Sequence, residues 1–176
     1  MSHKEQQQYV KSVKKIFKDN FINKKVLEVG SLNINGSVRN HFEGCDYLGI
    51  DVGEGKDVDM VIAGQDYDAP TGSYDTVISC ECFEHNPYWF ETFINMHRMC
   101  KTKGLIIMTC ATTGRAEHGT TKTTPQDSPF TLNWDYYKNL TEKDFTDRID
   151  MTDLFLAHQF STHEGNKDLQ FYGIKR

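Results

Sequence analysis

Residues 25–37 read KVLEVGSLNINGS, and this stretch decides the fold. Val26, Leu27 and Val29 form a short apolar run that ends at Gly30, where small and polar residues follow. An apolar run that ends in a glycine loop predicts a buried strand with a loop at its carboxyl end. Because open α/β sheets bind ligands at that end of their strands, we expect a ligand site here.

The composition favours one domain with a single core, since the chain has 176 residues. No apolar run approaches the roughly 20 residues that span a bilayer, and residues 1–10 lack the apolar core of a signal peptide. We therefore expect a cytoplasmic protein without a membrane anchor. The net charge of −5 disfavours nucleic acid as a partner, and five cysteines without a CxxC pair predict no metal site.

Apolar runs alternate with helical patterns along the chain, which predicts an α/β fold. The five runs that we interpret as strands are residues 26–29, 47–51, 59–64, 74–80 and 105–110. Helices are expected at residues 5–20, 37–42 and 81–100. The side chains expected on buried helix faces are Tyr9, Val13, Ile16, Phe17, Phe90, Phe93, Ile94, Met96 and Met99.

The end of the chain returns to regular structure after a long polar stretch. Thr141 with Asp144 has the spacing of a capping box and predicts a short helix. Apolar residues 154–160 and 169–175, separated by STHEGNKD, predict an antiparallel hairpin. The expected fold is a doubly wound, Rossmann-like sheet of about seven strands, mostly parallel with an antiparallel C-terminal strand.

Two acids and two glycines mark the ligand site. Glu28 precedes Gly30 and Gly36, and Asp51 follows 21 positions after Gly30, at the end of the next strand. A carboxylate there can accept hydrogen bonds from two ribose hydroxyls. Glu28 would repel a pyrophosphate, and GSLNING lacks the GxGxxG spacing, so nicotinamide or flavin dinucleotides are disfavoured. A ribose-containing ligand with a cationic head fits both acids.

Four segments carry a family resemblance: VLEVGSLNING, YLGIDV, GSYDTVISCECFEH and KTKGLIIMTC. With them the sequence resembles the class I S-adenosylmethionine-dependent methyltransferases of the small single-domain type, over residues 22–112. The resemblance implies S-adenosylmethionine as cofactor and S-adenosylhomocysteine as product. It also implies that cofactor contacts come from Glu28, Gly30, Ser31, Asn33, Gly36, Asp51, Val52, Asp66, Tyr67, Cys80 and Glu81. The loop departs from the family's GxGxG pattern, since residues 31–35 lengthen it.

The implied reaction is displacement at a sulfonium methyl group, which requires an aligned nucleophile and shelter from water. His85 and His118 are the candidate catalytic residues, because histidine can take a proton near neutral pH. Residues 114–121, GRAEHGTT, follow the fifth strand and place Arg115, Glu117 and His118 where an acceptor would enter; Tyr136 could stack on it. The alternative is a surface loop with a structural histidine at position 85.

We expect methyl transfer to an oxygen or nitrogen of a small molecule, with a sugar or nucleotide-linked sugar as candidate acceptor. One domain over residues 1–176 would comprise an N-terminal helix (1–21), a cofactor-binding core (22–112), a substrate-side loop (113–140) and a helix with a hairpin (141–176). Three alternatives remain: a non-catalytic cofactor-binding partner subunit, an NAD-type oxidoreductase and a nucleic-acid base methyltransferase. The last is weakened because the Asn-Pro-Tyr-Trp motif at residues 86–89 lies about six residues beyond the fourth strand.

Overall fold

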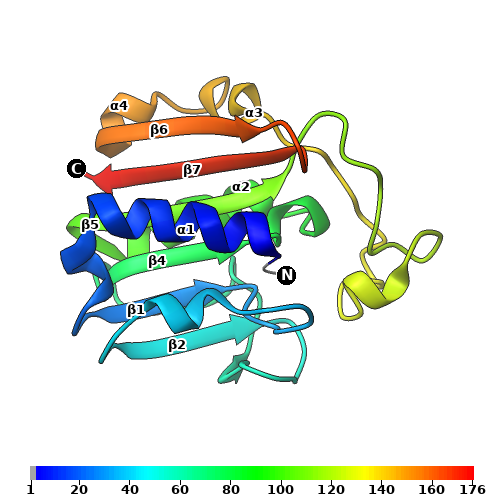
Figure 1. Cartoon of the computed structure of the whole chain (residues 1–176), viewed down its shortest axis with the longest axis horizontal. Helices are drawn as coiled ribbons and strands as arrows, with labels where there is room; N and C mark the ends of the chain where they lie inside the picture. Colours follow the sequence, from blue (N-terminus) through cyan, green and yellow to red (C-terminus); the bar gives the residue numbers. More distant parts are fainter. Residues whose placement is uncertain (1–2) are drawn as a thin grey trace.

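The computed structural model describes residues 3–176 and shows one mixed sheet with the strand order β3-β2-β1-β4-β5-β7-β6 (Figure 1). Its strands are β1 (Lys25–Val29), β2 (Asp46–Asp51), β3 (Met60–Val61), β4 (Tyr74–Cys80), β5 (Cys100–Ala111), β6 (Phe155–His163) and β7 (Asp168–Lys175). Strand β7 is antiparallel to both of its neighbours, and the other pairs are parallel. The predicted α/β sheet and the C-terminal hairpin are therefore confirmed.

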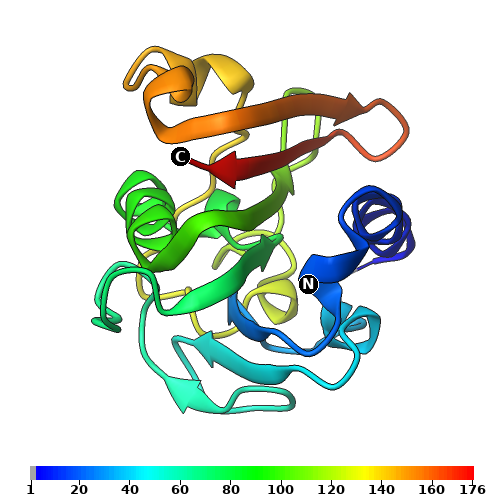
Figure 2. The same cartoon turned by 90° about the vertical axis from the view of Figure 1, so that its left-hand side faces the viewer.

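The two longer helices cover opposite faces of the sheet (Figure 2). The helices are α1 (Lys4–Ile16), α2 (Trp89–Met99), α3 (Glu142–Thr146) and α4 (Met151–Leu154). Successive residues of a strand point to opposite faces. Val26 accordingly packs in a core with Val10 of α1, whereas Leu27 packs in the second core with Phe93 of α2.

Helix α1 is shorter than predicted and buries a slightly different face. Its buried residues are Gln6, Val10 and Val13, whereas Ile16 is 62% exposed. The expectation that Ile16 is buried was wrong, because the helix ends there and the chain turns into a 3-10 helix at Lys18–Phe21. Phe21 takes the buried position in its place.

The helix expected at residues 37–42 is a single 3-10 turn, Val38–His41, so that prediction was wrong. Ser37 caps the turn, and its hydroxyl accepts the Arg39 N–H at 3.1 Å. Gly44 then turns the chain into β2 with a φ of +63°, which glycine adopts without strain. The connection is too short for a helix with an apolar face, and only Val38 of the turn is buried.

Helix α2 begins at Trp89, eight residues later than predicted from the sequence pattern. Asn86 precedes Pro87 and is extended, with φ −108° and ψ 111°, because a proline disfavours helical backbone in the residue before it. Residues Phe83–His85 form a separate 3-10 turn. Ile94 was expected to be buried but is 36% exposed.

The elements after α2 agree with the predictions in part. Strand β5 starts at Cys100 and includes residues 101–104, which we expected to separate helix from strand. The capping box of Thr141 and Asp144 is present at the start of α3, whereas α4 was not predicted.

No helix within residues 3–176 is long and apolar enough to cross a membrane. The long segment between β5 and α3 extends beyond the carboxyl ends of β1, β2, β4 and β5 (Figure 1).

Candidate active site

Asp51 lies at the carboxyl end of β2, and two backbone groups hold its side chain. Its carboxylate accepts the N–H of Leu32 at 2.9 Å and the N–H of Val52 at 2.7 Å. Burial raises the pKa of Asp51 above its ordinary value. A carboxylate has about four acceptor positions, so further hydrogen bonds from ligand hydroxyls remain possible.

Gly30 is required where β1 ends, because the backbone there passes directly over Cys82. Its φ is +80°, and a Cβ at this position would lie 2.6 Å from the Cβ of Cys82. A side chain would therefore be strained and would clash. Cys82 is a member of this site that the sequence reasoning missed, since it lies 52 positions along the chain from Gly30.

Asn33 explains the long loop between Gly30 and Gly36. Its side-chain oxygen accepts the N–H of Gly36 at 2.9 Å, and its amide donates to Asp57 at 2.6 Å. Asn33 thus anchors a turn within the loop, and its neighbours Leu32, Ile34 and Asn35 line the hollows described below. Ser31 lies at the base of this loop and is 2% exposed.

Glu28 and Cys80 are buried beneath the site, on the side of the sheet that α1 covers. The Tyr47 hydroxyl donates to the Glu28 carboxylate at 2.8 Å. Burial raises the pKa of Glu28 to about 7, against the lowering effect of that hydrogen bond. Cys80 packs in the same core as Val10. Neither residue lines the pockets described below.

A first hollow adjoins Asp51 and Gly30. Val52, Cys82, Gln65 and Asn86 also line it, and the long segment closes it with Thr131 and Trp134. Its volume is about 30 Å³, whereas pockets for organic ligands commonly measure about 300 Å³ or more. The segment therefore covers the place that Asp51 and Gly30 define. We refer to this hollow as the nucleoside pocket.

Asp66 and Tyr67, both expected among the cofactor contacts, lie outside the nucleoside pocket. Asp66 is exposed, and the Tyr67 hydroxyl pairs with that of Tyr74 at 2.8 Å. Gln65 and Asn86 lie on the pocket wall instead. Their contribution was not visible in the sequence, because it depends on how the loop after β3 meets the start of α2.

A second, larger hollow of about 540 Å³ holds most of the expected substrate residues, and we call it the acceptor pocket. Arg115, Glu117 and His118 line it together with Glu81. A narrow hollow lies between the two, sharing Asp51 with the nucleoside pocket and Glu81 with the acceptor pocket. Residues at or beyond the ends of β2, β4 and β5 thus line adjoining hollows.

The acceptor pocket also contains charged residues that are distant in sequence. His3 lies 3.7 Å from Glu81 and 3.6 Å from Asp168, and Arg115 lies 3.2 Å from Asp168. Burial opposes ionisation of Glu81, but His3 and Arg115 lower its pKa below the ordinary value. Burial and the Glu81 charge raise the pKa of Asp168 to about 6. Glu81 also has a φ of +52°, a conformation that is uncommon outside glycine and concentrates at functional sites.

The two candidate histidines lie together beside the acceptor pocket, and His118 lines it. Their ring centroids are 4.9 Å apart. Burial lowers the pKa of His85 to about 3, so His85 stays neutral near pH 7. His118 is partly exposed and lines the pocket. The aromatic ring beside them is Tyr137, 5.0 Å from the His118 ring centroid, whereas Tyr136 packs in the α2-side core.

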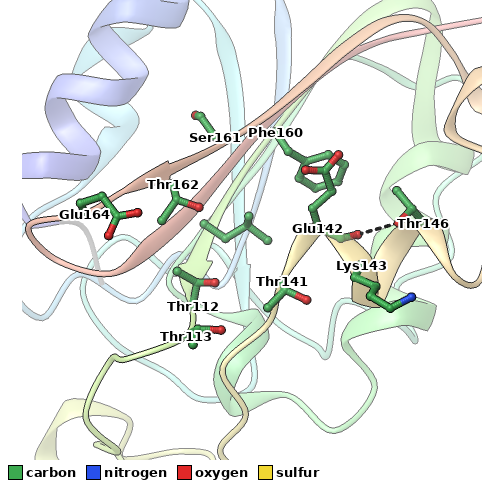
Figure 3. Close-up of a pocket in the computed structure, with 11 residues that line it drawn as sticks. Thr112, Thr113, Thr141, Glu142, Lys143, Thr146, Phe160, Ser161, Thr162 and Glu164 are labelled. Carbon is green, nitrogen blue, oxygen red and sulfur yellow. Dashed lines mark hydrogen bonds between the residues drawn. The ribbon is translucent and has the colours of Figure 1, made fainter.

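A third hollow of about 610 Å³ lies elsewhere, between the end of β5, α3 and β6 (Figure 3). Hydroxyl groups dominate its lining, among them Thr112 and Thr141 (Figure 3). Its charged residues, Glu142, Lys143 and Glu164, are all exposed. It shares no lining residue with the nucleoside pocket or the acceptor pocket. We therefore assign the chemistry to the adjoining pockets around Asp51 and Glu81.

The fold and this site define a class: an α/β enzyme with a glycine loop after β1 and a ribose-type acid after β2. The family model for the methyltransferase domain matches residues 1–162, and the chain belongs to this family. It is a class I S-adenosylmethionine-dependent methyltransferase, and its cofactor is S-adenosylmethionine. The predicted family, enzyme class and cofactor are confirmed.

Solved structures show the same fold at low sequence identity. The 1,6-didemethyltoxoflavin-N1-methyltransferase of Burkholderia thailandensis, with S-adenosylhomocysteine bound, is 12% identical, with a TM-score of 0.60 over 99% of this chain and 91% of that chain. Phosphoethanolamine N-methyltransferase 2 of Haemonchus contortus, in complex with S-adenosylmethionine, is 12% identical, with a TM-score of 0.65 over 96% of this chain and 52% of that chain.

A third similar structure comes from Haloferax volcanii, a complex between the Trm112 methyltransferase activator and a putative methyltransferase. It is 10% identical, with a TM-score of 0.58 over 98% of this chain and 94% of that chain. A comparison with curated protein sequences gives no match.

Proposed function

We propose that this enzyme transfers the methyl group of S-adenosylmethionine to an oxygen or nitrogen of a small molecule held in the acceptor pocket. The observation that carries the proposal is the row of adjoining hollows, which share Asp51 and Glu81 and end at His118. The cofactor supplies an electrophilic sulfonium methyl group when bound. The protein's task is then to align the acceptor and to exclude water.

The residues present fit this cofactor. Asp51, fixed by two backbone N–H groups, would accept the ribose hydroxyls. The bare backbone at Gly30 would allow close approach, and ionised Glu81 would bind the ammonium group. Trp134 and Thr131 would have to move away from the nucleoside pocket as the cofactor enters.

The acceptor that we propose is a sugar or nucleotide-linked sugar, with His118 acting on its reacting atom. Arg115, Glu117 and Asp127 give the pocket wall both charge signs, which suits a ligand with many hydroxyl groups. The structurally similar enzymes named above act on other small molecules, a toxoflavin precursor and phosphoethanolamine. A single domain, a cytoplasmic location and a small molecule instead of nucleic acid as partner also remain proposals, and the net charge of −5 supports the last.

Calorimetric titration with S-adenosylhomocysteine tests the cofactor site. Asp51→Ala should weaken binding at least tenfold, because each hydrogen bond to a charged group contributes about 1.5–3 kcal/mol. Asp46→Ala is the matched control, since Asp46 begins the same strand at its opposite end and is exposed. Equal affinity of Asp51→Ala and the wild type would refute the assignment.

Transfer of label from methyl-labelled S-adenosylmethionine to a metabolite mixture tests catalysis and distinguishes an enzyme from a non-catalytic partner subunit. A labelled small molecule should appear, and His118→Ala should reduce its yield while S-adenosylhomocysteine affinity stays unchanged. Equal yield from wild type and His118→Ala would remove His118 from the reaction.

A further inference from the structure

Glu84, His85 and His118 converge beside the acceptor pocket, and His118 is the member of this cluster that lines it. One ligand-type atom of each residue lies within 4.8 Å of the other two. His85 Nε2 is 4.0 Å from Glu84 Oε1, and the two imidazole rings are nearly perpendicular, at 86°. The 3-10 turn after β4 supplies two of these groups, and the segment after β5 supplies the third.

His85 is buried without a partner for its polar atoms. Its side chain is 4% exposed, and neither ring nitrogen makes a hydrogen bond. Buried polar groups are nearly always hydrogen-bonded, and leaving one unsatisfied costs about 1–3 kcal/mol. The backbone of Gly119 covers this ring so closely that a Cβ there would lie 2.7 Å from His85 Cε1. A ligand on a ring nitrogen would account for this histidine.

A backbone carbonyl selects the tautomer of neutral His118. Its Nδ1 lies 3.0 Å from the carbonyl oxygen of Ala116, an acceptor that needs a proton on Nδ1. In the neutral imidazole Nε2 then carries the lone pair. Histidines that bind metals commonly donate their other N–H to a carboxylate or a backbone carbonyl in this way.

Glu84 is a second buried group of this cluster whose polar atoms are unsatisfied. Its side chain is fully buried, and neither oxygen of its carboxyl group makes a hydrogen bond. The cations nearby, His3 and Arg115, contact Glu81 and Asp168. A positive charge beside Glu84 would stabilise its carboxylate.

We propose that Glu84, His85 and His118 bind a divalent first-row transition metal ion. Two imidazoles and one carboxylate suit Zn²⁺, Mn²⁺, Co²⁺ or Fe²⁺, and three protein ligands leave coordination positions open. The second group of converging side chains, His3, Glu81 and Asp168, is a poorer metal site because Arg115 already neutralises Asp168. This inference differs from the expectation, drawn from cysteine spacing, that no metal is bound.

The metal site deepens the proposed function, and its consequence for the acceptor rests on that function. Because His118 lines the acceptor pocket, a ligand oxygen can complete the coordination. A bound cation lowers the pKa of a coordinated hydroxyl, which favours an oxygen acceptor over an amine. His118 then acts as a metal ligand instead of a general base.

Metal binding can be measured on the full chain without cofactor or acceptor. Protein treated with EDTA and dialysed is titrated with MnCl₂, free Mn²⁺ is followed by electron paramagnetic resonance, and ZnCl₂ is added as a competitor. We expect one saturable Mn²⁺ per chain that Zn²⁺ displaces. Binding to the wild type no stronger than to the double variant Glu84→Gln, His118→Ala would overturn the proposal.

The single variants His118→Ala and Glu84→Gln should each lose at least tenfold in Mn²⁺ affinity. His158→Ala is the matched control, since His158 lies on β6 outside this cluster and should keep wild-type affinity. His118 is partly exposed on a loop, so its variant should fold, and thermal melting checks this. Unchanged affinity in folded His118→Ala would refute the site. Because no cofactor is present, this failure would leave the proposed methyl transfer standing, whereas failure of the Asp51→Ala titration would not affect the metal site.

Discussion

Glu28→Gln should change how the stability of the protein depends on pH. Glu28 is 3% exposed, and burial raises its pKa from 4.5 to about 7 in the folded chain. The folded state therefore holds a proton that the unfolded state releases at lower pH. The stabilisation that this proton provides is fully present below pH 4.5 and is lost as the pH rises towards 7. Above about pH 7 the free energy of unfolding no longer depends on Glu28 ionisation.

The size of this effect follows from the two pKa values. Because the pKa of Glu28 is 4.5 in the unfolded chain and about 7 in the folded chain, the free energy of unfolding falls by about 2.5 kcal/mol between pH 5 and pH 8. Glutamine keeps the volume and cannot ionise. Urea unfolding is measured at intervals from pH 5 to pH 8. The free energy of unfolding of Glu28→Gln minus that of the wild type should increase by about 2.5 kcal/mol over this range.

Two further variants make the measurement specific. Glu54→Gln removes an exposed glutamate and should reproduce the wild-type pH dependence. Tyr47→Phe removes the hydroxyl that donates to Glu28, which should raise the Glu28 pKa further and extend the loss of stability to higher pH. A difference between Glu28→Gln and the wild type that is constant from pH 5 to pH 8 would refute the reasoning.

Three other substitutions test packing and access. Gly30→Ala should lower both the melting temperature and S-adenosylhomocysteine affinity, because its Cβ would lie 2.6 Å from that of Cys82; calorimetry with unchanged values would show that the loop adjusts. Phe93→Ala removes a fully buried ring and should reduce the free energy of unfolding in urea by about 3–5 kcal/mol, and a loss below about 1 kcal/mol would contradict this packing. Trp134→Ala should speed S-adenosylhomocysteine association in stopped-flow fluorescence, since this ring closes the nucleoside pocket; an unchanged rate would mean that the segment does not limit entry.

Local patterns predicted the strands well and the helices less well. Apolar runs identify strands reliably here because the central strands β1, β4 and β5 are covered on both faces. The helix at residues 37–42 was predicted from local signals at its two ends. Such signals do not show that the connection to β2 is too short for a helix with an apolar face. At residues 81–88 the proline effect on Asn86 outweighed the helical spacing.

Site residues at the ends of strands could be predicted from the sequence, whereas site residues on the long segment could not. Asp51 and Gly30 could be singled out because both directly end a strand, at the edge where α/β sheets bind ligands. The place of Trp134 on the nucleoside pocket depends on the path of the long segment, which local sequence patterns do not show. Tyr137, and not Tyr136, lies beside the histidines. The sequence does not distinguish these two adjacent tyrosines, because their positions depend on side-chain packing.

The sequence by itself determined the fold class, the family and the cofactor, because strand-forming runs, the glycine loop and the acid after β2 are local features. The tertiary structure alone decided which distant groups share one site. His3 and Asp168 meet Glu81 because α1 and β7 both begin near the carboxyl end of β4 (Figure 1). Glu84, His85 and His118 converge because the parallel pairing of β4 with β5 brings the segments after both strands to the same edge.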